Sequence, residues 1–393
     1  MKDMDLDMQR WIALHEKEDT ARLLLRHHGE PGITQAVTQI ECRKKAAAKL
    51  PRLLENPAFM FPHSLSAEQC TSESLAEFHA SLAGEGKNIL DMTAGLGVDA
   101  IAMSRRGRVT AIDISTEAAQ ALRHNAEILG LDTLSAICAD SVDWLKKNDK
   151  TFDVIFIDPA RRSSSGGRVK ALADCEPDVT HLLPAMLAKA PVIIIKASPM
   201  LDLTGTIEEL NRSAGTHGHV SSIFAVGTPR ECKEVVAIVR RGASADKPGI
   251  AAITVLNDGT VVKTEVTDGC SLPVYGQPEQ NMWLYEPYPS VMKLGNRIPV
   301  NNVQKLDSNT NLYISETLQN DFPGLAMKIE RVEKFNDKNI REIGKSIAEA
   351  NVTTRNFIIS APELAKRLKI KEGGEKRIYG TRAAGKLTLI VAS

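Results

Sequence analysis

Closely spaced cysteine pairs are missing from the sequence. The six cysteines are scattered between Cys42 and Cys270, and no C-x-x-C occurs. Zinc sites and small disulfide frameworks need paired cysteines, so neither is expected and no metal is assigned. The thiols are instead typical of a reduced, cytoplasmic protein. His217 and His219 flank a glycine in a predicted surface loop and are not interpreted as a metal pair.

Long hydrophobic runs and an excess of charge are also missing. Apolar runs such as VIFI and VIII have the length of strands, and the acidic start MKDMDLDMQRW lacks the apolar stretch of a signal peptide. No membrane partner is therefore expected. Lys and Arg together number 49, as do Asp and Glu, so net charge identifies no partner. Aromatic residues make up 4% of the chain, which leaves few platforms on which single-stranded bases could stack.

The hydrophobic pattern divides the chain into four predicted regions. Residues 1–85 space apolar residues as helices do. Residues 86–241 alternate short apolar runs with helical stretches, which is typical of a parallel sheet with helices on both faces. Residues 242–325 are predicted as a small α+β region and residues 326–393 as a basic α+β region. The fold class is therefore α/β, with a helical N-terminal part and an α+β C-terminal part.

Local signals place elements in the C-terminal part. Asn257-Asp258-Gly259 indicates a hairpin. The segments IREIGKSIAEA and APELAKRLKI are predicted helices, TRNFIIS a strand, and KRIYGTRAAGKLTLIVAS a closing hairpin.

Acidic residues follow the predicted strands of the 86–241 region. The first strand ends in Asp91 and leads into Gly95-x-Gly97-x-x-Ala100. The second ends in Asp113, 22 positions after Asp91, and Asp140 and Asp158 follow the third and fourth strands. Ligands of such sheets bind outside the carboxyl ends of the strands, so these carboxylates are expected at one site.

This pattern separates two nucleoside cofactors. In an NAD site the pyrophosphate lies at the N-terminus of the helix after the glycine loop. Asp91 disfavours phosphate there and suits an ammonium group, which S-adenosylmethionine carries. An acid about 20 positions further on, here Asp113, can bind ribose hydroxyls in both cases. Asp140 is placed to meet an adenine amino group. S-adenosylmethionine is therefore the expected cofactor, and an NAD enzyme is disfavoured.

Residues 87–240 resemble a class I S-adenosylmethionine-dependent methyltransferase. LDMTAGLGVDA is similar to the first motif of that family, Asp113 to its ribose-binding acid and Asp140-Ser141 to its adenine-side motif. TAGLGVDA is especially similar to the loop of bacterial 16S rRNA guanine-N2 methyltransferases. With its helical front and its RLKI…GTRAAGK tail, the whole chain resembles bacterial methyltransferases that carry a THUMP-like C-terminal region, and THUMP domains bind RNA.

The resemblance implies a Rossmann-like sheet and RNA, rRNA or tRNA, as partner. The motif residues assigned to the cofactor are Asp91, Thr93, Ala94, Gly95, Gly97, Asp113, Ile114, Asp140, Ser141 and Asp158.

The segment DPAR resembles the D/N-P-P-x motif of amino-group methyltransferases. In that motif the acid or amide accepts hydrogen bonds from the target amine, and an aromatic residue stacks on the base. Asp158 and Pro159 match, whereas Ala160 replaces the second proline and Arg161 the aromatic residue. The Arg161 guanidinium can still stack, with an attraction of about 0.5–2 kcal/mol. The favoured acceptor is an exocyclic base amine such as guanine N2.

Other acceptors remain open. Ribose 2′-O methyltransferases often use Lys-Asp-Lys-Glu, and Asp158, Lys196 and either Glu231 or Glu234 could converge, with Lys87 as the first lysine by elimination. Carbon-5 methylation of a pyrimidine needs a nucleophilic cysteine. None adjoins DPAR in the sequence, since Cys175 comes 17 positions after Asp158. A protein or small-molecule acceptor, and a non-enzymatic RNA-binding protein with an inactive domain, are the further alternatives.

Two flanking segments complete the predicted site. In SLSAEQCTSES, Ser66 and Thr71 are predicted to start helices, and Gln69 and Thr71 to cover the methionine end of the cofactor. SSSGGRVK, residues 163–170, is predicted to gate the acceptor pocket.

Basic residues are concentrated at the C-terminal end. Residues 361–393 hold eight Lys or Arg against three Glu. Such a local excess can meet phosphates, and the predicted RNA-binding residues are Lys366, Arg367, Lys376 and Arg377. Arg43, Lys44 and Lys45 on an N-terminal helix are a second basic candidate.

Overall fold

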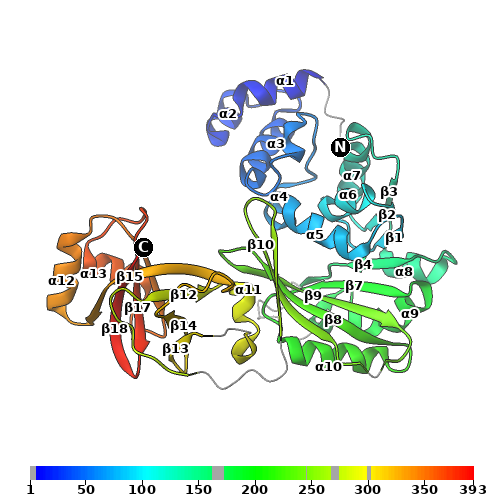
Figure 1. Cartoon of the computed structure of the whole chain (residues 1–393). Coiled ribbons are helices and arrows are strands. Elements are labelled where there is room, and N and C mark those ends of the chain that lie inside the picture. The colour runs from blue at the N-terminus through cyan, green and yellow to red at the C-terminus, as the bar shows by residue number, and fades with distance from the viewer. Residues whose placement is uncertain (1–5, 162–171, 245, 267–273, 299–301) are drawn as a thin grey trace. The chain divides into compact units, whose positions relative to one another are not determined.

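The computed structural model of the chain consists of two compact units (Figure 1). Unit 1 comprises Met1–Phe224 and Glu234–Gly249, and unit 2 comprises Ala225–Lys233 and Ile250–Ser393. The structure describes residues 6–161, 172–244, 246–266, 274–298 and 302–393. Among these residues, no helix is long and apolar enough to cross a bilayer.

The start of unit 1 is helical. Ile12, Leu23, Val37, Ile40 and Met60 pack into one buried cluster, because each faces inward from its helix or loop. The helices are α1 (Leu6–His15), α2 (Thr20–Arg26), α3 (Ile33–Ala46), α4 (Ser64–Gln69) and α5 (Glu73–Ala83).

A twisted sheet forms the centre of unit 1. Within this unit its strands lie in the order β3-β2-β1-β4-β7-β9-β8, which are seven of the nine strands of the sheet. The first five are parallel, and β9 runs antiparallel to β7. The strands are β1 (Asn88–Asp91), β2 (Arg108–Asp113), β3 (Leu134–Cys138), β4 (Val154–Ile157), β7 (Val192–Ala197), β8 (Gly218–Gly227) and β9 (Cys232–Arg241).

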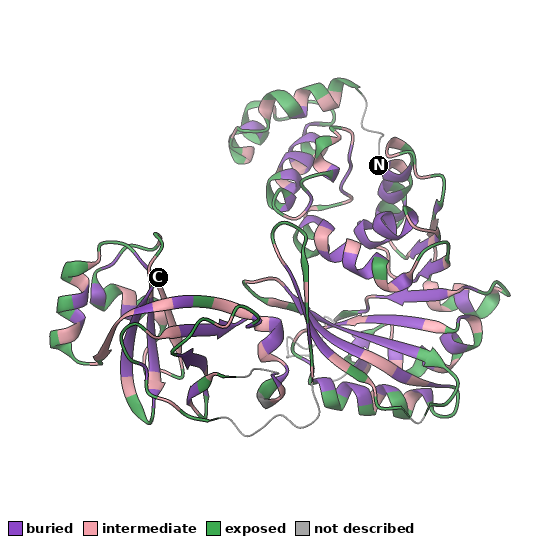
Figure 2. Cartoon of the chain, viewed as in Figure 1, coloured by how far each residue is buried: buried purple, intermediate pink, exposed green. Residues whose placement is uncertain are grey.

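Helices cover both faces of this sheet, so its central strands are buried (Figures 1 and 2). The VIFI run of β4 is buried at every position, as expected of a strand covered on two sides. Side chains at the helix starts satisfy free backbone N–H groups: Ser115, Asp140, Asp178 and Asp202 accept hydrogen bonds from them. The helices are α6 (Val98–Ser104), α7 (Thr116–Ile128), α8 (Ser141–Lys147), α9 (Val179–Lys189) and α10 (Leu203–Ala214).

The predicted alternation of strands and helices in residues 86–241 is confirmed, with a local error at β8. His219 lies in β8, where a surface loop was predicted. The segment GHVSSIFAVG was missed because its buried residues do not alternate regularly along the strand. The predicted helix starts at Ser66 and Thr71 are also wrong, since His63 caps α4 and Ser72 caps α5.

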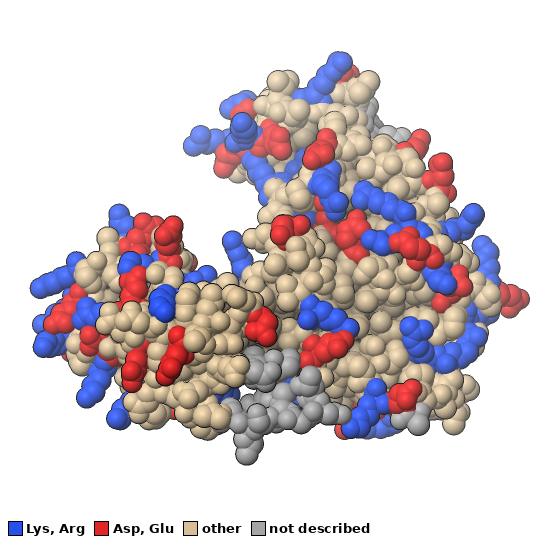
Figure 3. Space-filling view, in the orientation of Figure 1, with Lys and Arg blue, Asp and Glu red and all other residues tan. Residues whose placement is uncertain are grey.

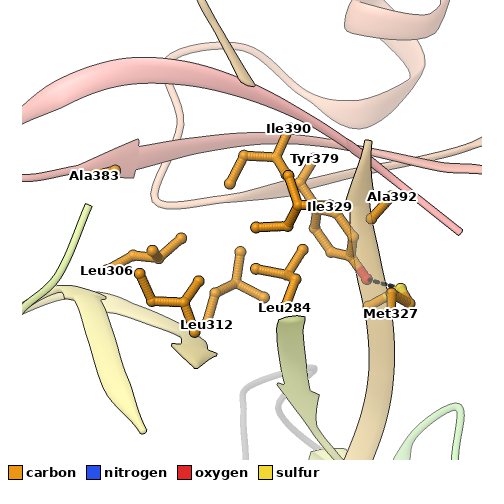
Figure 4. Packing of buried hydrophobic residues seen from close by; sticks show 10 residues of the cluster. Leu284, Leu306, Leu312, Met327, Ile329, Tyr379, Ala383, Ile390 and Ala392 are labelled. Carbon is orange, nitrogen blue, oxygen red and sulfur yellow. Dashed lines mark hydrogen bonds between the residues drawn. The ribbon is translucent and has the colours of Figure 1, made fainter. Parts of the chain in front are cut away.

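Unit 2 contains a β-hairpin and a seven-stranded sheet of order β13-β14-β12-β15-β18-β17-β16. The core of the sheet includes Leu284, Leu312, Ile329, Tyr379 and Ile390 (Figure 4). The strands are β10 (Gly249–Val255), β11 (Val261–Glu265), β12 (Trp283–Pro287), β13 (Gln304–Asp307), β14 (Thr310–Ser315), β15 (Gly324–Lys334), β16 (Asn351–Arg355), β17 (Arg377–Ala383) and β18 (Lys386–Ala392). The helices are α11 (Pro289–Met292), α12 (Asp337–Ser346) and α13 (Ala361–Leu368).

Both hairpins predicted for this part are confirmed: β10 pairs with β11 and β17 with β18. The strand predicted at TRNFIIS is shifted, because β16 ends at Arg355. Asn356 then takes a left-handed backbone conformation with φ of 52°, which ends the extended run. A short two-stranded ribbon, β5 (Ala160–Arg161) with β6 (Cys175–Glu176), follows β4 in unit 1.

Candidate active site

The loop after β1 leaves its backbone open on one side. Gly95 has a φ of +54°, and a Cβ added there would meet no atom within 4 Å. Gly97 has a φ of +84°, and a Cβ there would lie 2.2 Å from Cδ1 of Leu122 on α7. Gly97 is therefore needed for packing, whereas Gly95 leaves the loop accessible to a ligand.

Asp91 ends β1 and is almost completely buried. Its Oδ1 accepts a hydrogen bond from the Thr93 N–H at 3.0 Å. Burial raises the pKa of Asp91 to about 8, because the charged carboxylate loses its hydration. A cation at this carboxylate would restore its ionised form. The predicted ammonium contact of S-adenosylmethionine is consistent with this requirement.

Asp113 ends β2 and holds the loop in shape. Its Oδ2 accepts from the Gly95 N–H and its Oδ1 from the Ser115 N–H, both at 2.8 Å. Each carboxylate oxygen keeps a second lone pair for a ribose hydroxyl. The next residue, Ile114, exposes 74% of its surface, which is unusual for its size and suits an adenine ring.

The third acidic residue is also a helix cap. Asp140 Oδ1 accepts from the N–H groups of Val142 and Asp143 at 2.9 Å. Its side chain therefore has a fixed direction at the start of α8, whose first residue is Ser141. Together with Trp144 and Asn148 it lines a hollow beside the carboxyl end of β3. A nucleoside with a cationic tail would fit the groups offered by the loop after β1, Asp113, Ile114 and this hollow.

Asp158 follows β4 and is hydrogen-bonded to the loop after β1. Its backbone N–H donates to Oγ1 of Thr93 at 2.7 Å. Its Oδ2 accepts a hydrogen bond from Nζ of Lys196, the fifth residue of β7, at 2.6 Å. The Asp158 side chain is 40% exposed, against 12% for Lys196. Asp158 can therefore reach an acceptor while Lys196 stays behind it.

A buried polar network continues from Lys196. Its Nζ donates to Oγ1 of Thr71 at 2.9 Å and lies 3.9 Å from Oε2 of Glu234. Thr71 in turn donates to Oδ2 of Asp99 at 2.7 Å. The His79 ring lies between the two carboxylates, with Nδ1 2.7 Å from Asp99 Oδ1 and Nε2 2.6 Å from Glu234 Oε1.

Ionisation in this network is set by its carboxylates. Burial disfavours the charged His79 ring, but Glu234 and Asp99 outweigh it and raise the pKa of His79 to about 10. Burial likewise opposes ionisation of Asp99, yet the His79 charge lowers the pKa of Asp99 to about 2. Lys196 follows the same rule: burial disfavours the ammonium, and the surrounding carboxylates raise its pKa.

Sequence reasoning missed Asp99 and His79 altogether. Asp99 stands within GLGVDA, but the motif predicts no role for it. His79 lies on the buried face of α5 and belongs to no motif. Glu234 was one of two candidates; the other, Glu231, pairs instead with Lys233. No spacing rule connects residues from α5, α6, β7 and β9.

The remaining predicted site residues are placed unevenly. Pro159 is buried beside Asp158, and Ala94 donates its N–H to the Ile112 carbonyl. Gln69 is exposed at the end of α4. Of Arg161 only the backbone, in β5, is described. The segment SSSGGRVK lies outside the described residues.

The spatial position of Cys175 corrects the sequence argument. No cysteine adjoins DPAR along the chain, but Cys175 is the register partner of Arg161 across β5 and β6. Sequence distance was misleading because the chain folds back on itself. The residue is only 3% exposed. Among the described residues, no group of three or more His, Cys, Asp or Glu side chains is arranged to hold a metal ion.

Lys and Arg are mixed with Asp and Glu over the visible surface (Figure 3). Three of the four predicted RNA-binding residues have carboxylate neighbours: Arg367 has Asp337, Lys376 has Glu330 and Arg377 has Glu286. Lys366 is exposed. On the N-terminal helices, three carbonyl groups hold Arg43, the Glu18 carbonyl binds Lys44, and Glu68 binds Lys45.

The chain is similar over almost its whole length to a protein of known structure. A protein from Porphyromonas gingivalis W83, whose crystal structure is described as that of a "putative methyltransferase", is 30% identical over 98% of this chain and 97% of its own, with a TM-score of 0.80. The chain belongs to this family of class I S-adenosylmethionine-dependent methyltransferases. Its fold and its cofactor class are therefore as predicted from the strand ends.

Family models agree with this membership. Residues 73–211 match "conserved hypothetical protein 95", residues 283–323 a ferredoxin-like domain, and residues 324–393 a THUMP domain-like model. The THUMP-like C-terminal part expected from the tail is thus confirmed, whereas the exact boundaries of the four regions stay predictions.

Two curated relatives match over shorter stretches. The 23S rRNA (uracil(1939)-C(5))-methyltransferase RlmD of Shewanella amazonensis is 28% identical over 142 residues. A protein of Mycoplasma mobile named "Uncharacterized RNA methyltransferase MMOB5020" is 24% identical over 92 residues. These stretches are 34% and 23% of this methyltransferase. They span only 31% and 25% of the relatives' own lengths.

Proposed function

We propose that this methyltransferase transfers the methyl group of S-adenosylmethionine to an exocyclic base amine of rRNA or tRNA, with guanine N2 as the favoured acceptor. The observation that carries the proposal is the position of Asp158. It follows β4, its backbone is bonded to the cofactor loop through Thr93, and its side chain is partly exposed. RNA as the substrate is supported by the names of both curated relatives, which describe RNA methyltransferases, and by the THUMP-like part.

The proposed chemistry asks for orientation and a proton acceptor. The cofactor, when bound, supplies a methyl group already activated on its sulfonium. Asp158 accepts a hydrogen bond from the amine N–H and so aims the nitrogen lone pair at the methyl group. Lys196 occupies one oxygen of Asp158, which leaves the other for the amine. The nitrogen becomes cationic after transfer and loses its proton to Asp158 or to water.

Ribose 2′-O methylation is the second candidate. Asp158, Lys196 and Glu234 converge, as the Lys-Asp-Lys-Glu pattern requires. Lys87, the candidate for the first lysine, precedes β1 at the opposite end of that strand, and His79 lies nearer the cluster. In that chemistry the Lys196 amine would have to take the hydroxyl proton. Its carboxylate neighbours raise its pKa and so oppose this role, which favours the amine acceptor.

The acceptor is tested by mass spectrometry of nucleosides after the pure protein, deuterated-methyl S-adenosylmethionine and unmodified rRNA or tRNA are mixed. Labelled N2-methylguanosine is expected. A labelled 2′-O-methyl nucleoside would move the proposal to the second candidate, and no label in any RNA would contradict an RNA substrate. Replacing Asp158 with Ala should slow transfer by about 10² to 10⁴-fold, as for loss of a proton acceptor. The exposed Asp149→Asn variant is the matched control.

The same experiment tests methylation at carbon 5 of a pyrimidine, because Cys175 lies across from Arg161 in the β5–β6 ribbon. A cysteine nucleophile must reach the base, and Cys175 is buried. Cys175→Ser should therefore retain transfer. A labelled 5-methylpyrimidine together with complete loss in Cys175→Ser would overturn the amine proposal.

A further inference from the structure

His79 is the most completely buried charged group in the network behind Asp158, the residue proposed to bind the methyl acceptor. Its side chain has 0% exposure, and both ring nitrogens face carboxylate oxygens at 2.6 and 2.7 Å. A neutral imidazole has one N–H and one lone pair. In that form the lone pair would face a carboxylate. Only the doubly protonated ring donates to Asp99 and Glu234 at the same time.

The groups around His79 come from several elements. Asp99 lies at the start of α6, Glu234 in β9, and Phe156 of β4 packs with its ring centroid 5.7 Å from the His79 ring. Lys196 of β7 approaches Glu234, and the buried Asp91 of β1 is the next carboxyl group. His79 and Lys196 thus face the carboxylates of Asp99, Glu234 and Asp158.

A chain of hydrogen bonds leads from His79 to Asp158 through this network. Asp99, fixed by His79, accepts the Thr71 hydroxyl proton. The Thr71 oxygen lone pairs are therefore turned toward Lys196, whose ammonium donates to Thr71 and to Asp158. On the other side, His79 holds Glu234 beside the same ammonium. The Lys196 ammonium is thereby held against Asp158 from two directions.

We propose that His79 is a positioning residue for methyl transfer: as an imidazolium clamped between Asp99 and Glu234, it fixes the Lys196 ammonium that orients Asp158 toward the acceptor. The inference rests on the proposed function in taking Asp158 as the group that meets the acceptor. Among the described residues the hydrogen bonds of the His79 ring go to Asp99 and Glu234 and not to Asp158, so its effect on Asp158 is indirect.

The kinetic test compares four proteins: wild type, His79→Gln, the charge-balanced double variant His79→Gln/Glu234→Gln, and the control His181→Gln, whose histidine is exposed on α9. His79→Gln should lower kcat by about 10²-fold, the typical effect of misplacing a reacting group. Affinity for S-adenosylmethionine by calorimetry should change less than about 3-fold. The double variant should recover part of this loss, by about tenfold in kcat, because one cation and one carboxylate leave together and the Asp99–Thr71–Lys196 hydrogen bonds do not involve Glu234.

A purely structural role predicts a different pattern. Both His79 variants would then lose thermal stability and cofactor affinity together, with no recovery in the double variant. An unchanged kcat in a folded His79→Gln protein would overturn the proposal.

The closing experiment does not need an RNA substrate. NMR of protein carrying ¹³C-labelled aspartate carboxyls follows the titration of Asp158, and ¹⁵N-labelled histidine reports the His79 ring. The His79 ring is expected to stay doubly protonated through pH 8, and the Asp158 titration should move to higher pH in His79→Gln but not in His181→Gln. A neutral ring at pH 7, or an Asp158 titration that does not move, overturns the inference. Absence of RNA methylation by the wild type overturns only the proposed function.

Discussion

The Thr93 hydroxyl oxygen accepts a hydrogen bond from the backbone N–H of Asp158 at 2.7 Å, across 65 positions of sequence. Thr93 belongs to the loop that carries Gly95 and Gly97, and Asp158 to the motif assigned to the acceptor. One hydroxyl group thus connects the loop proposed to bind the cofactor with the residue proposed to bind the acceptor. Because β1 and β4 are neighbours in the sheet, this connection is short and direct.

Replacing Thr93 with Val should damage this connection without changing side-chain volume much. The Asp158 N–H would lose its partner, at a cost of about 1–3 kcal/mol for an unsatisfied buried group. We expect a lower free energy of unfolding and a lower kcat, with both recovered in Thr93→Ser, which keeps the hydroxyl. Urea unfolding and methyl transfer measured on the same samples provide the check. Equal behaviour of the Val and Ser variants would contradict the role of the hydroxyl.

Substitution of Gly97 and of Gly95 by Ala should have different effects on stability and on cofactor affinity. Gly97→Ala combines a left-handed backbone with the close approach to Leu122 and should cost about 2–5 kcal/mol of stability. Gly95→Ala carries only the backbone strain, about 1–2 kcal/mol, because its Cβ would meet open space. The added methyl group should nevertheless reduce affinity for S-adenosylmethionine. Gly130→Ala, with a φ of +65° and open space, is the control for strain alone. Chemical denaturation and calorimetry distinguish these outcomes, and equal losses of stability in Gly97→Ala and Gly130→Ala would sink the packing argument.

Asp91 predicts a pH dependence of cofactor binding. Burial raises its pKa from 3.8 to about 8, so most of the ligand-free protein carries a neutral Asp91 at pH 6.5. An ammonium group binds the ionised form, so binding should release a proton and affinity should rise with pH by at most about tenfold per unit below pH 8. Calorimetry in buffers of different ionisation enthalpy measures the proton. Asp91→Asn should remove the dependence. Methylthioadenosine, which lacks the amino-acid tail, should show none with the wild type, and proton release with that ligand would argue against the ammonium contact.

The raised pKa of Asp91 also makes the free energy of unfolding depend on pH. A carboxyl group whose pKa is higher in the folded state favours folding at low pH, and this contribution is lost as pH rises from about 4 to 8. Relative to wild type, Asp91→Asn should therefore become more stable across that window. Thermal unfolding between pH 4.5 and 8.5 gives the comparison, with the exposed Asp149→Asn variant as control.

The sequence was sufficient to predict that four acids stand at the ends of neighbouring strands, and insufficient for the network behind them. Asp91, Asp113, Asp140 and Asp158 each follow a strand directly, and parallel strands bring their carboxyl ends to one edge, so strand recognition alone brings the acids together. His79 and Glu234 instead meet across 155 positions. Their pairing depends on how α5 packs on the sheet, which no local pattern encodes. The position of Cys175 depended in the same way on a ribbon, β5 with β6, that has only two residues per strand.

The basic tail, residues 361–393, is the predicted RNA-binding surface. Arg367, Lys376 and Arg377 have carboxylate neighbours, so each would exchange an existing ion pair for a phosphate contact. Such exposed pairs contribute only about 0–1 kcal/mol, so the exchange is possible but lowers the gain from each contact. Lys366 is exposed, and among the described residues no carboxylate lies within ion-pairing distance of it. We therefore expect Lys366→Gln to weaken RNA binding more than Lys376→Gln.

Removal of the competing carboxylate gives the sharper test of this tail. Asp337→Asn frees Arg367 and should tighten RNA binding if Arg367 meets a phosphate, whereas the charge-matched control Asp149→Asn, in unit 1, should not. In filter binding across a salt series, each lost phosphate contact should reduce the slope of log K against log salt by about 0.7–0.9. Affinity for S-adenosylmethionine should stay constant in all of these variants, because its assigned residues lie in unit 1. An unchanged salt slope in Lys366→Gln, together with an unchanged affinity in Asp337→Asn, would exclude the tail as the RNA-binding surface. Attention would then move to Lys44 and Lys45 on α3, whose present partners are the Glu18 carbonyl and Glu68.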